Sequence, residues 1–537
     1  MASAAAAHAW TPSRSAAGPY SPWLIVSIIS LPTFMEVLDT SIANVSLGHI
    51  AGGLSISNDE STWVLTSYLV ANAIVIPISG WLSDVIGRKR YFMISIALFT
   101  ISSFLCGIAP NLTTLVLARV FQGIGGGGLA PVEQSILADT FPPNKRGSAF
   151  AAFAIVVIVG PVLGPTLGGY ITEHSSWHWI FLINVPVGII ALFLVEIFVD
   201  EPEAIKEERR QLYARGIRID YVGVLLVALG LGFLEITADR GQRADWFSSG
   251  LITTTAIISG VSLIALVFWE LNHDDPVVDL RLLKNRNFAL TILVMGTTGM
   301  ILFGTTQLIP QMLQQVLGYS ALDAGLALTA GGFATLVAVP IAGRLSDKVD
   351  VRFLLFPALV IQAAALWNMA HLTPDISFKD AALARLYQSV ALPFLFIPIN
   401  AVAYVGLPQR KTAQASSLLN VFRNLGGTIG ISFSQVLLAN GLQRHQSVLV
   451  EQLNPLNPNF QDWIQTAAPL FGGGGQPGAM ADPTTLAVLY QQMQRQAAML
   501  SFLDVFHALM IVVLIVSPVA LLMRKPKGKA AGGGMGH

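Results

Sequence analysis

The chain has 537 residues, of which 53% are hydrophobic and only 12% are Asp, Glu, Lys or Arg. Soluble domains carry about 25% charged residues, so this composition excludes an ordinary soluble enzyme, a disordered chain and a coiled coil. The 31 basic residues balance the 31 acidic ones, and a net charge of zero does not suggest a nucleic-acid partner. With a mean hydropathy of +0.63, the chain is predicted to be an all-α membrane protein with many spans.

Apolar segments long enough to cross a bilayer, which takes about 20 residues of helix, recur along the whole chain. The fourteen predicted spans lie near residues 23–45, 62–82, 91–109, 113–138, 148–171, 179–199, 219–238, 250–270, 288–308, 323–343, 353–371, 384–407, 415–438 and 502–523. An even number of spans places both ends of the chain on the same side of the membrane.

Basic residues gather in the two tails and in the loops that follow even-numbered spans. These segments hold 23 of the 31 Lys and Arg residues, including the run Arg88–Arg90. Short loops rich in Lys and Arg stay on the cytoplasmic side of a membrane. We therefore expect both termini to lie in the cytoplasm.

A short motif, G-x-L-S-D, occurs twice in the same setting. It stands at Gly80–Asp84 after the second predicted span and at Gly343–Asp347 after the tenth. If these positions are equivalent, spans 1–6 and 9–14 form two six-helix halves, and spans 7 and 8 form an inserted pair. Paired halves with a site between them near the membrane midplane are typical of transporters.

This repeat sets the expected organisation of the chain. The predicted parts are a cytoplasmic tail at 1–22, an N-terminal half at 23–199, a linker with the inserted pair at 200–286, a C-terminal half at 287–523 and a cytoplasmic tail at 524–537. Within the last half, the polar segment 440–500 is expected to be an external loop. It is either a disordered connector or a docking surface for an external partner, and its stretch Gln491–Gln496 could extend the last span beyond the bilayer.

Longer motifs connect this pattern to a known family. They are Leu38–Val45 (LDTSIANV), Leu117–Gly123 (LARVFQG), Gly160–Gly169 (GPVLGPTLGG), Trp177–Gly188 (WHWIFLINVPVG), Asp239–Gly241 with Asp245–Phe247, and Asn285–Phe288 (NRNF). In this order, over about residues 23–523, the chain resembles the major facilitator superfamily, specifically its fourteen-helix drug:proton antiporter branch of EmrB/QacA type.

The resemblance implies a proton-driven exporter in a bacterial inner membrane that moves lipophilic or amphipathic compounds outward. It implies the proton gradient as energy source, no cofactor, and no enzymatic activity. Its EmrB-like character implies two protein partners, a periplasmic adaptor of the membrane-fusion type (EmrA-like) and an outer-membrane channel (TolC-like). The alternatives are a metabolite or siderophore transporter of the same fold, and a membrane receptor or scaffold that transports nothing.

Charged residues inside spans are the best functional clue, because a charge at a helix centre costs about 2.5–3.5 kcal/mol on insertion scales. Asp39 in the first span and Arg119 in the fourth both lie roughly 9 Å below the outer surface, so they can interact. Asp39 is predicted to load and release a proton as the cavity opens and closes; otherwise the pair is static and only orients two helices. Glu36 shares the face of Asp39 and is a second proton site, a contact for cationic substrates, or a headgroup or loop contact.

Other polar and adaptable apolar residues within spans are candidates for the substrate cavity. These are Glu133, Gln122, Arg423, Asn420, Phe34 and Met35. Helical periodicity places Glu133 on broadly the same side as Arg119, whereas Arg423 is either the polar site of the second half or a donor between helices. Phe34 and Met35 could line an adaptable cavity or simply belong to the core.

The two repeated motifs predict a cytoplasmic gate, in which acidic and basic side chains hold that end of the bundle closed. Its members are Gly80, Asp84, Gly87, Arg88, Gly343 and Asp347. The fifth span carries a second glycine pattern, the helix-5 antiporter motif, with members Gly160, Pro161, Gly164, Pro165 and Gly168. A helix face without side chains lets a neighbouring helix approach closely, and the prolines add bends.

Three other chemistries are not supported by the sequence. The run Gly125–Gly128 lacks the following Lys-Ser/Thr of a phosphate-binding loop, so nucleotide binding is not expected. His8, His49, His174 and His178 show no metal-ligand spacing, and no metal is expected. Cys106 is the only cysteine, which excludes an internal disulfide.

Overall fold

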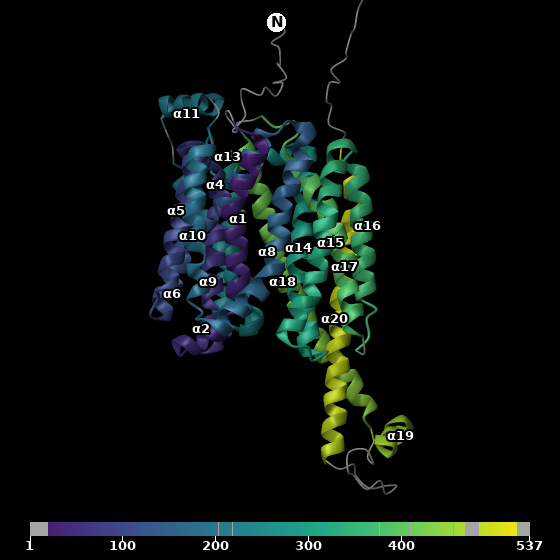
Figure 1. The fold of residues 1–537 in the computed structure, drawn as a ribbon. Helices are drawn as coiled ribbons and strands as arrows, with labels where there is room; N and C mark the ends of the chain where they lie inside the picture. Colours follow the sequence, from purple (N-terminus) through teal and green to yellow (C-terminus); the bar gives the residue numbers. More distant parts are fainter. Residues whose placement is uncertain are drawn as a thin grey trace, which may run out of the picture.

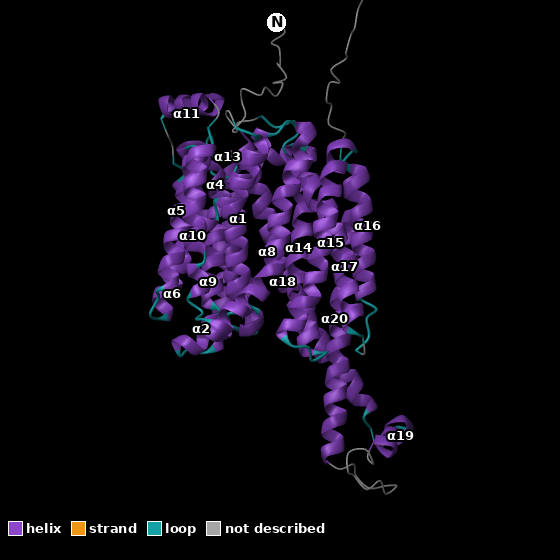
Figure 2. Cartoon of the chain, in the orientation of Figure 1, coloured by secondary structure: helices purple, strands orange, loops and turns teal. Residues whose placement is uncertain are grey.

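The structure is a computed structural model that describes residues 20–201, 203–216, 219–374, 376–408, 411–454, 456–467 and 483–523. Within these ranges every regular element is a helix (Figure 2). Thirteen helices are long and apolar enough to cross a membrane, or up to fourteen if the bent pair within residues 143–174 is one span. The predicted all-α polytopic fold is therefore confirmed.

The first six predicted spans form one side of the bundle (Figure 1). They are α1 (Pro22–Val45), α4 (Trp63–Ile86), α5 (Arg88–Gly107), α6 (Leu112–Gly126) with α7 (Leu129–Thr140), α8 (Arg146–His174), and α9 (Trp179–Leu182) with α10 (Asn184–Phe198). The connecting elements are α2 (Leu47–Leu54), α3 (Asn58–Ser61) and the 3-10 turn η2 (Pro143–Lys145). The fourth and sixth spans are each divided in two, which hydropathy alone did not reveal.

The remaining helices follow the predicted order. They are α11 (Glu203–Arg215), α12 (Tyr221–Arg240), α13 (Gly250–Asn272), α14 (Arg286–Gln315), α15 (Ala321–Lys348), α16 (Arg352–Met369), α17 (Phe378–Ala403), α18 (Thr412–Gln452), α19 (Pro458–Ala467) and α20 (Pro483–Leu521), with 3-10 turns η3 (Gln242–Ala244), η4 (Trp246–Ser248) and η5 (Leu280–Lys284). Helix α12 packs against both α4 and α18, so the expected inserted pair touches both sides of the bundle.

The two sides of the bundle meet near the ends of the helices that carry the basic loops. There Ser417 on α18 donates a hydrogen bond to the backbone oxygen of Ile76 on α4 at 2.5 Å. The ring of Phe153 on α8 stacks on that of Phe396 on α17, with 5.8 Å between centroids. These contacts link α4 to α18 and α8 to α17 across the bundle.

The segment 440–500 differs from the expected loop. Helix α18 continues to Gln452 and α20 already begins at Pro483, so most of the described part of this segment is helical. The two helices project beyond the rest of the bundle, with α19 at their far end (Figure 1). The extension of the last span through Gln491–Gln496 is as predicted, whereas the interpretation as a disordered connector is wrong for the described helical residues. The run Gly472–Gly475 and the two tails, 1–19 and 524–537, lie outside the described residues.

Glycines on α8 bring this helix against α1. A side chain at Gly164 would place its Cβ 2.1 Å from Ser41 Oγ, and one at Gly160 would lie 2.6 Å from Val37 Cγ1. At Gly168 the nearest atom, Ile42 Cγ2, is 3.2 Å away. The chain bends by 45° between Pro161 and Thr166, whereas the side chain of Pro165 is outside the described set. The absence of side chains on this face therefore sets the distance between α1 and α8.

We expect Gly164→Ala to destabilise the protein by about 1–3 kcal/mol, because the added methyl overlaps Ser41 and forces α1 and α8 apart. Thermal unfolding of the purified protein in detergent measures the effect. Gly169→Ala is the matched control, since nothing lies within 4 Å of its Cβ position. Equal melting temperatures for the two variants would contradict close packing at Gly164.

Candidate functional site

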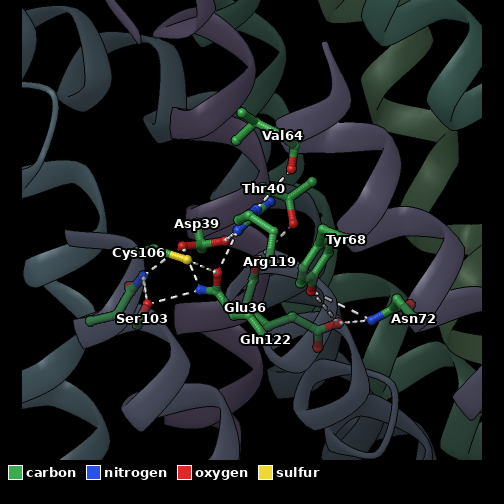
Figure 3. Close-up of polar contacts among 11 residues, drawn as sticks. Glu36, Asp39, Thr40, Val64, Tyr68, Asn72, Ser103, Cys106, Arg119 and Gln122 are labelled. Atoms are coloured by element: carbon green, nitrogen blue, oxygen red, sulfur yellow. Dashed lines mark hydrogen bonds and ion pairs between the residues drawn. The ribbon is translucent and has the colours of Figure 1, made fainter. Parts of the chain in front are cut away.

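A buried ion pair joins α1 to α6. Asp39 Oδ2 accepts a hydrogen bond from a terminal nitrogen of Arg119 at 2.6 Å, and both side chains are completely shielded from solvent. Figure 3 shows the two side chains pointing toward each other between the helices. The sequence placed these residues at equal depth, and the structure brings them into contact.

The second oxygen of Asp39 is held by two amides. Gln122 donates to Asp39 Oδ1 at 3.0 Å, and Asn184 donates to the same oxygen at 2.7 Å. Both amides also donate to Ser103 Oγ on α5, at 2.8 and 3.1 Å. Every donor to the carboxylate is an N–H group, which is the pattern of an ionised acid. Four helices, α1, α5, α6 and α10, thus converge on one carboxylate.

Arg119 is also enclosed by polar and aromatic groups, although one of its terminal nitrogens has no hydrogen-bond partner among the described residues. Its Nε donates to the backbone oxygen of Val64 at 2.9 Å, and a terminal nitrogen donates to Gln122 at 2.7 Å. The guanidinium carbon lies 4.3 Å from the ring centroid of Tyr68, a cation–π distance. Gly123 permits this approach, because a Cβ there would lie 2.4 Å from the backbone oxygen of Tyr68. The cation is therefore compensated from α1, α4 and α6 together.

Glu36 lies in a different environment from Asp39, although the two share a helix. It accepts hydrogen bonds from Tyr68 at 3.2 Å and from Asn72 at 3.1 Å, both on α4 (Figure 3). It is half-buried rather than fully buried, and it also interacts electrostatically with Arg423 on α18. The other oxygen of Glu36, Oε2, is shielded from solvent and has no hydrogen-bond partner among the described residues, whereas both oxygens of Asp39 are paired.

The candidate cavity residues separate into different groups. Gln122 is a member of the Asp39 network, so its amide is already engaged. Asn420 donates across the bundle to Gln134 on α7 at 2.7 Å. Arg423 is buried, and its Nε donates only to the neighbouring Asn424 at 3.3 Å. Of the candidates on α18, Arg423 is thus the one left available to a ligand.

Glu133 is not part of the Asp39 network. It accepts a hydrogen bond from Ser30 on α1 at 2.6 Å and is fully buried. The helix is interrupted at Gly127 and Gly128, between α6 and α7, so counting turns from Arg119 does not give the direction of Glu133. Met35 is completely buried in the core, whereas Phe34 is half-buried.

The predicted gate residues occupy the end of the bundle with the basic loops. Asp347 accepts from the backbone N–H of Gly147 at 2.8 Å and from the backbone and hydroxyl of Ser148, at the start of α8. Gly343 permits this contact, since its Cβ would lie 2.8 Å from Ala151. A carboxylate at a helix N-terminus is favourable, so Asp347 fastens α15 to α8.

The first copy of the motif makes contacts within its own side and across the bundle. Arg88 forms a buried ion pair with Asp139 on α7. Gly87 ends α4 with a φ of +101°, a conformation that suits glycine. Gly80 lies against the start of α18, where its Cβ would be 2.9 Å from Gln414 Cα. Asp84 lies in the last turn of α4.

Sequence reasoning missed two members of the Asp39 network. Asn184 lies in the motif Trp177–Gly188. It is the one strongly polar side chain in the part of this motif that falls within a predicted span, and this could have identified it as a candidate. Ser103 carried no such signal, because a serine in an apolar helix usually bonds to its own backbone. The described residues contain no group of His, Cys, Asp and Glu that could hold a metal ion.

A bundle of apolar helices with a buried charge network at membrane depth defines a multi-pass membrane protein of the transporter class. The family model described as Major Facilitator Superfamily matches residues 29–431. The chain belongs to this family.

Curated relatives resemble the chain over nearly its whole length. Multidrug export protein EmrB of Haemophilus influenzae is 39% identical over 90% of this chain and 92% of its own. Multidrug export protein EmrB of Escherichia coli is 38% identical over 95% and 96%. Among solved structures, the proton:xylose symporter XylE is 14% identical with a TM-score of 0.57, covering 94% of this chain and 99% of its own, which shows the shared fold.

We expect Arg119→Gln to destabilise the protein by about 3–5 kcal/mol, because it leaves the Asp39 carboxylate buried without its cation. The double variant Asp39→Asn with Arg119→Gln should recover part of this loss. Chemical or thermal unfolding of the purified protein measures both.

Lys89→Gln is the control for a charge pair that water can reach. It removes a partly exposed ion pair with Glu196 and should cost at most about 1 kcal/mol. Similar losses for Lys89→Gln and Arg119→Gln would mean that burial does not decide the strength of the pair.

Proposed function

We propose that the protein is a proton-driven multidrug exporter that moves lipophilic or amphipathic compounds outward across a bacterial inner membrane. The observation that carries the proposal is the completely buried Asp39–Arg119 pair with its two amide donors. The similarity to two EmrB multidrug export proteins supports the substrate class.

Proton coupling follows from what protonation does to this network. A protonated Asp39 carries no charge, so Arg119 loses its counter-ion and the two amides lose a strong acceptor. Helices α6 and α10 are then held less firmly to α1. Because α1 packs closely against the glycine face of α8, a shift of α1 is transmitted to α8, which also contacts α15 and α17 of the other side. Binding of a proton thereby favours a different arrangement of the two sides.

Substrate recognition is assigned to charged and aromatic groups on α1, α7 and α18. Glu36 offers a carboxylate to cationic compounds, and Arg423 offers a cation on the opposite side. Phe34 adds a half-buried aromatic surface on α1. Glu133 is a fully buried acid on α7 and is proposed as a second group that senses protons or substrate.

The contacts of Asp347 and Ser417 hold the basic end of the bundle together. We propose that both termini lie in the cytoplasm; this arrangement then corresponds to the outward-facing state, and its opening gives the inward-facing state. The two six-helix halves at 23–199 and 287–523 are the proposed moving bodies, with the inserted segment 200–286 beside them.

The projecting helices α18 and α20 are proposed to dock a periplasmic adaptor, which would connect the exporter to an outer-membrane channel. They extend beyond the bundle with α19 at their tip (Figure 1). Their outer parts carry exposed apolar side chains, among them Val448 on α18 and Tyr490 on α20, and Leu456 is exposed between α18 and α19. Apolar groups outside the bilayer are suited to a protein interface.

We expect Asp39→Asn to abolish substrate uptake driven by a pH gradient in inverted vesicles, because the amide cannot take up a proton. Glu36→Gln should weaken transport of cationic compounds and leave proton coupling in place. Efflux driven by an imposed gradient, together with substrate binding to the purified protein, separates the two effects.

The control is the amount of folded protein in the membrane, to which each transport rate is normalised, because Asp39→Asn leaves Arg119 buried without its counter-ion. Transport by the Asp39→Asn variant against a substrate gradient, driven by a pH gradient, would contradict the proposal. Uptake into the cytoplasm, measured as movement out of inverted vesicles, would instead indicate a metabolite importer.

We expect a photo-cross-linking residue at position 456 to capture the adaptor in cells, because the Leu456 side chain, between α18 and α19, is 86% exposed. The same probe at Val261 on α13, which faces the lipid side of the bundle, is the matched control. Equal capture at both positions, or capture at Val261 alone, would contradict docking through the projecting helices.

A further inference from the structure

A second buried arginine lies on α17, in a sequence that repeats the one around Arg119. The stretch Leu117–Gly123 reads LARVFQG, and Leu383–Ser389 reads LARLYQS. In both copies the arginine hydrogen-bonds to the glutamine three residues later, Arg119 to Gln122 and Arg385 to Gln388. The side chain of Arg385 is 95% buried, since only 5% of it is exposed.

The surroundings of Arg385 are polar but neutral. Its terminal nitrogens donate to Thr305 Oγ1 at 3.4 Å and to Thr306 Oγ1 at 3.3 Å, both on α14. Gln388 donates to Thr305 Oγ1 at 2.6 Å, and this hydroxyl donates in turn to the backbone oxygen of Ile301. The Nε of Arg385 is buried and has no hydrogen-bond partner among the described residues.

The two copies differ in one chemical respect. In the first, the partner from the neighbouring helix is the carboxylate of Asp39 at 2.6 Å; in the second, it is the hydroxyl of Thr305. No described carboxylate lies within ion-pair distance of Arg385. A buried guanidinium without a counter-ion is costly, because its hydration is lost and nothing of opposite charge replaces it.

We infer that Arg385 is the centre of a binding site for a monovalent anion, either the carboxylate headgroup of an amphipathic substrate or a chloride ion from solution. The substrate source rests on the proposed export function, whereas the chloride source does not. The free Nε–H and the long bonds to Thr305 and Thr306 supply donors that a stronger acceptor can take over. The site is the anion-binding counterpart of a pair that the other copy completes with its own aspartate.

The two residues that follow Thr305 on α14 are less buried than Arg385 itself. Thr306 is half-buried, and the next residue along α14, Gln307, is exposed. We infer that an anion enters from this side, whereas the rings of Tyr68 and Phe181 cover Arg119.

The test compares octanoate with octylammonium and chloride with a bulky buffer anion, using thermal unfolding of the full-length purified protein. Octanoate or chloride should stabilise the wild type, and octylammonium should not. Thr305→Asp places an internal carboxylate beside Arg385, as Asp39 stands beside Arg119, and should weaken anion binding about tenfold or more. Thr305→Asn is the matched control, because asparagine has the size of aspartate but no charge, and this variant should retain anion binding.

Arg385→Gln should also remove the stabilisation by anions. If Arg385→Gln does not fold, the comparison of Thr305→Asp with Thr305→Asn still tests the inference. If octanoate stabilises the wild type and chloride does not, the ligand is a substrate carboxylate. If chloride stabilises it at least as much as octanoate does, the ligand is an anion from solution. The inference is overturned if Thr305→Asp and Thr305→Asn respond alike, or if no anion stabilises the wild type. Binding needs no proton gradient, so failure of transport by the wild type would contradict the exporter proposal and the substrate source of the anion, but not the anion site itself.

Discussion

The cost of burying charge in an apolar bundle governs the functional part of this protein. Asp39 and Arg119 are tolerated at membrane depth because each neutralises the other and because Gln122 and Asn184 occupy the second carboxylate oxygen. If one of these side chains changes its charge, the others lose favourable contacts and we expect them to shift. In the mechanism that we propose, this network would connect the protonation of Asp39 to the positions of the helices that hold it.

Close helix packing turns that local change into a change of shape. Gly164 lets α8 lie directly against α1, and Gly123 lets α6 lie directly against α4. Helices in such contact have no flexible side chains between them that could absorb a displacement. Movement at Asp39 is therefore passed to α8, which reaches the other side of the bundle through Gly147 and Asp347.

The two sides share a pattern but not a chemistry. Both carry an Arg-x-x-Gln sequence on corresponding helices, yet only the first provides its own carboxylate. This difference is suited to a division of roles, in which one side binds protons and the other binds ligands. On α14 the acceptors for the second arginine are the hydroxyls of Thr305 and Thr306, whereas on α1 the acceptor for the first is the carboxylate of Asp39.

Much of the fold was readable from the sequence, because apolar length and the placement of Lys and Arg are imposed by the bilayer itself. The same physics marked Asp39 and Arg119, since a charge inside a span needs a partner. Contacts between distant helices were decided only in the tertiary structure: Asn184 joins Asp39 across 145 residues, and Gln122 proved to be part of the ion-pair network rather than of an open cavity. Counting helical turns from Arg119 could not give the direction of Glu133, because the helix breaks at Gly127. The segment 440–500 was predicted to be a loop because it is polar, but α18 and α20 continue into it as helices, since polarity does not end a helix outside the bilayer. Sequence determined which groups must avoid lipid; packing determined which of them meet.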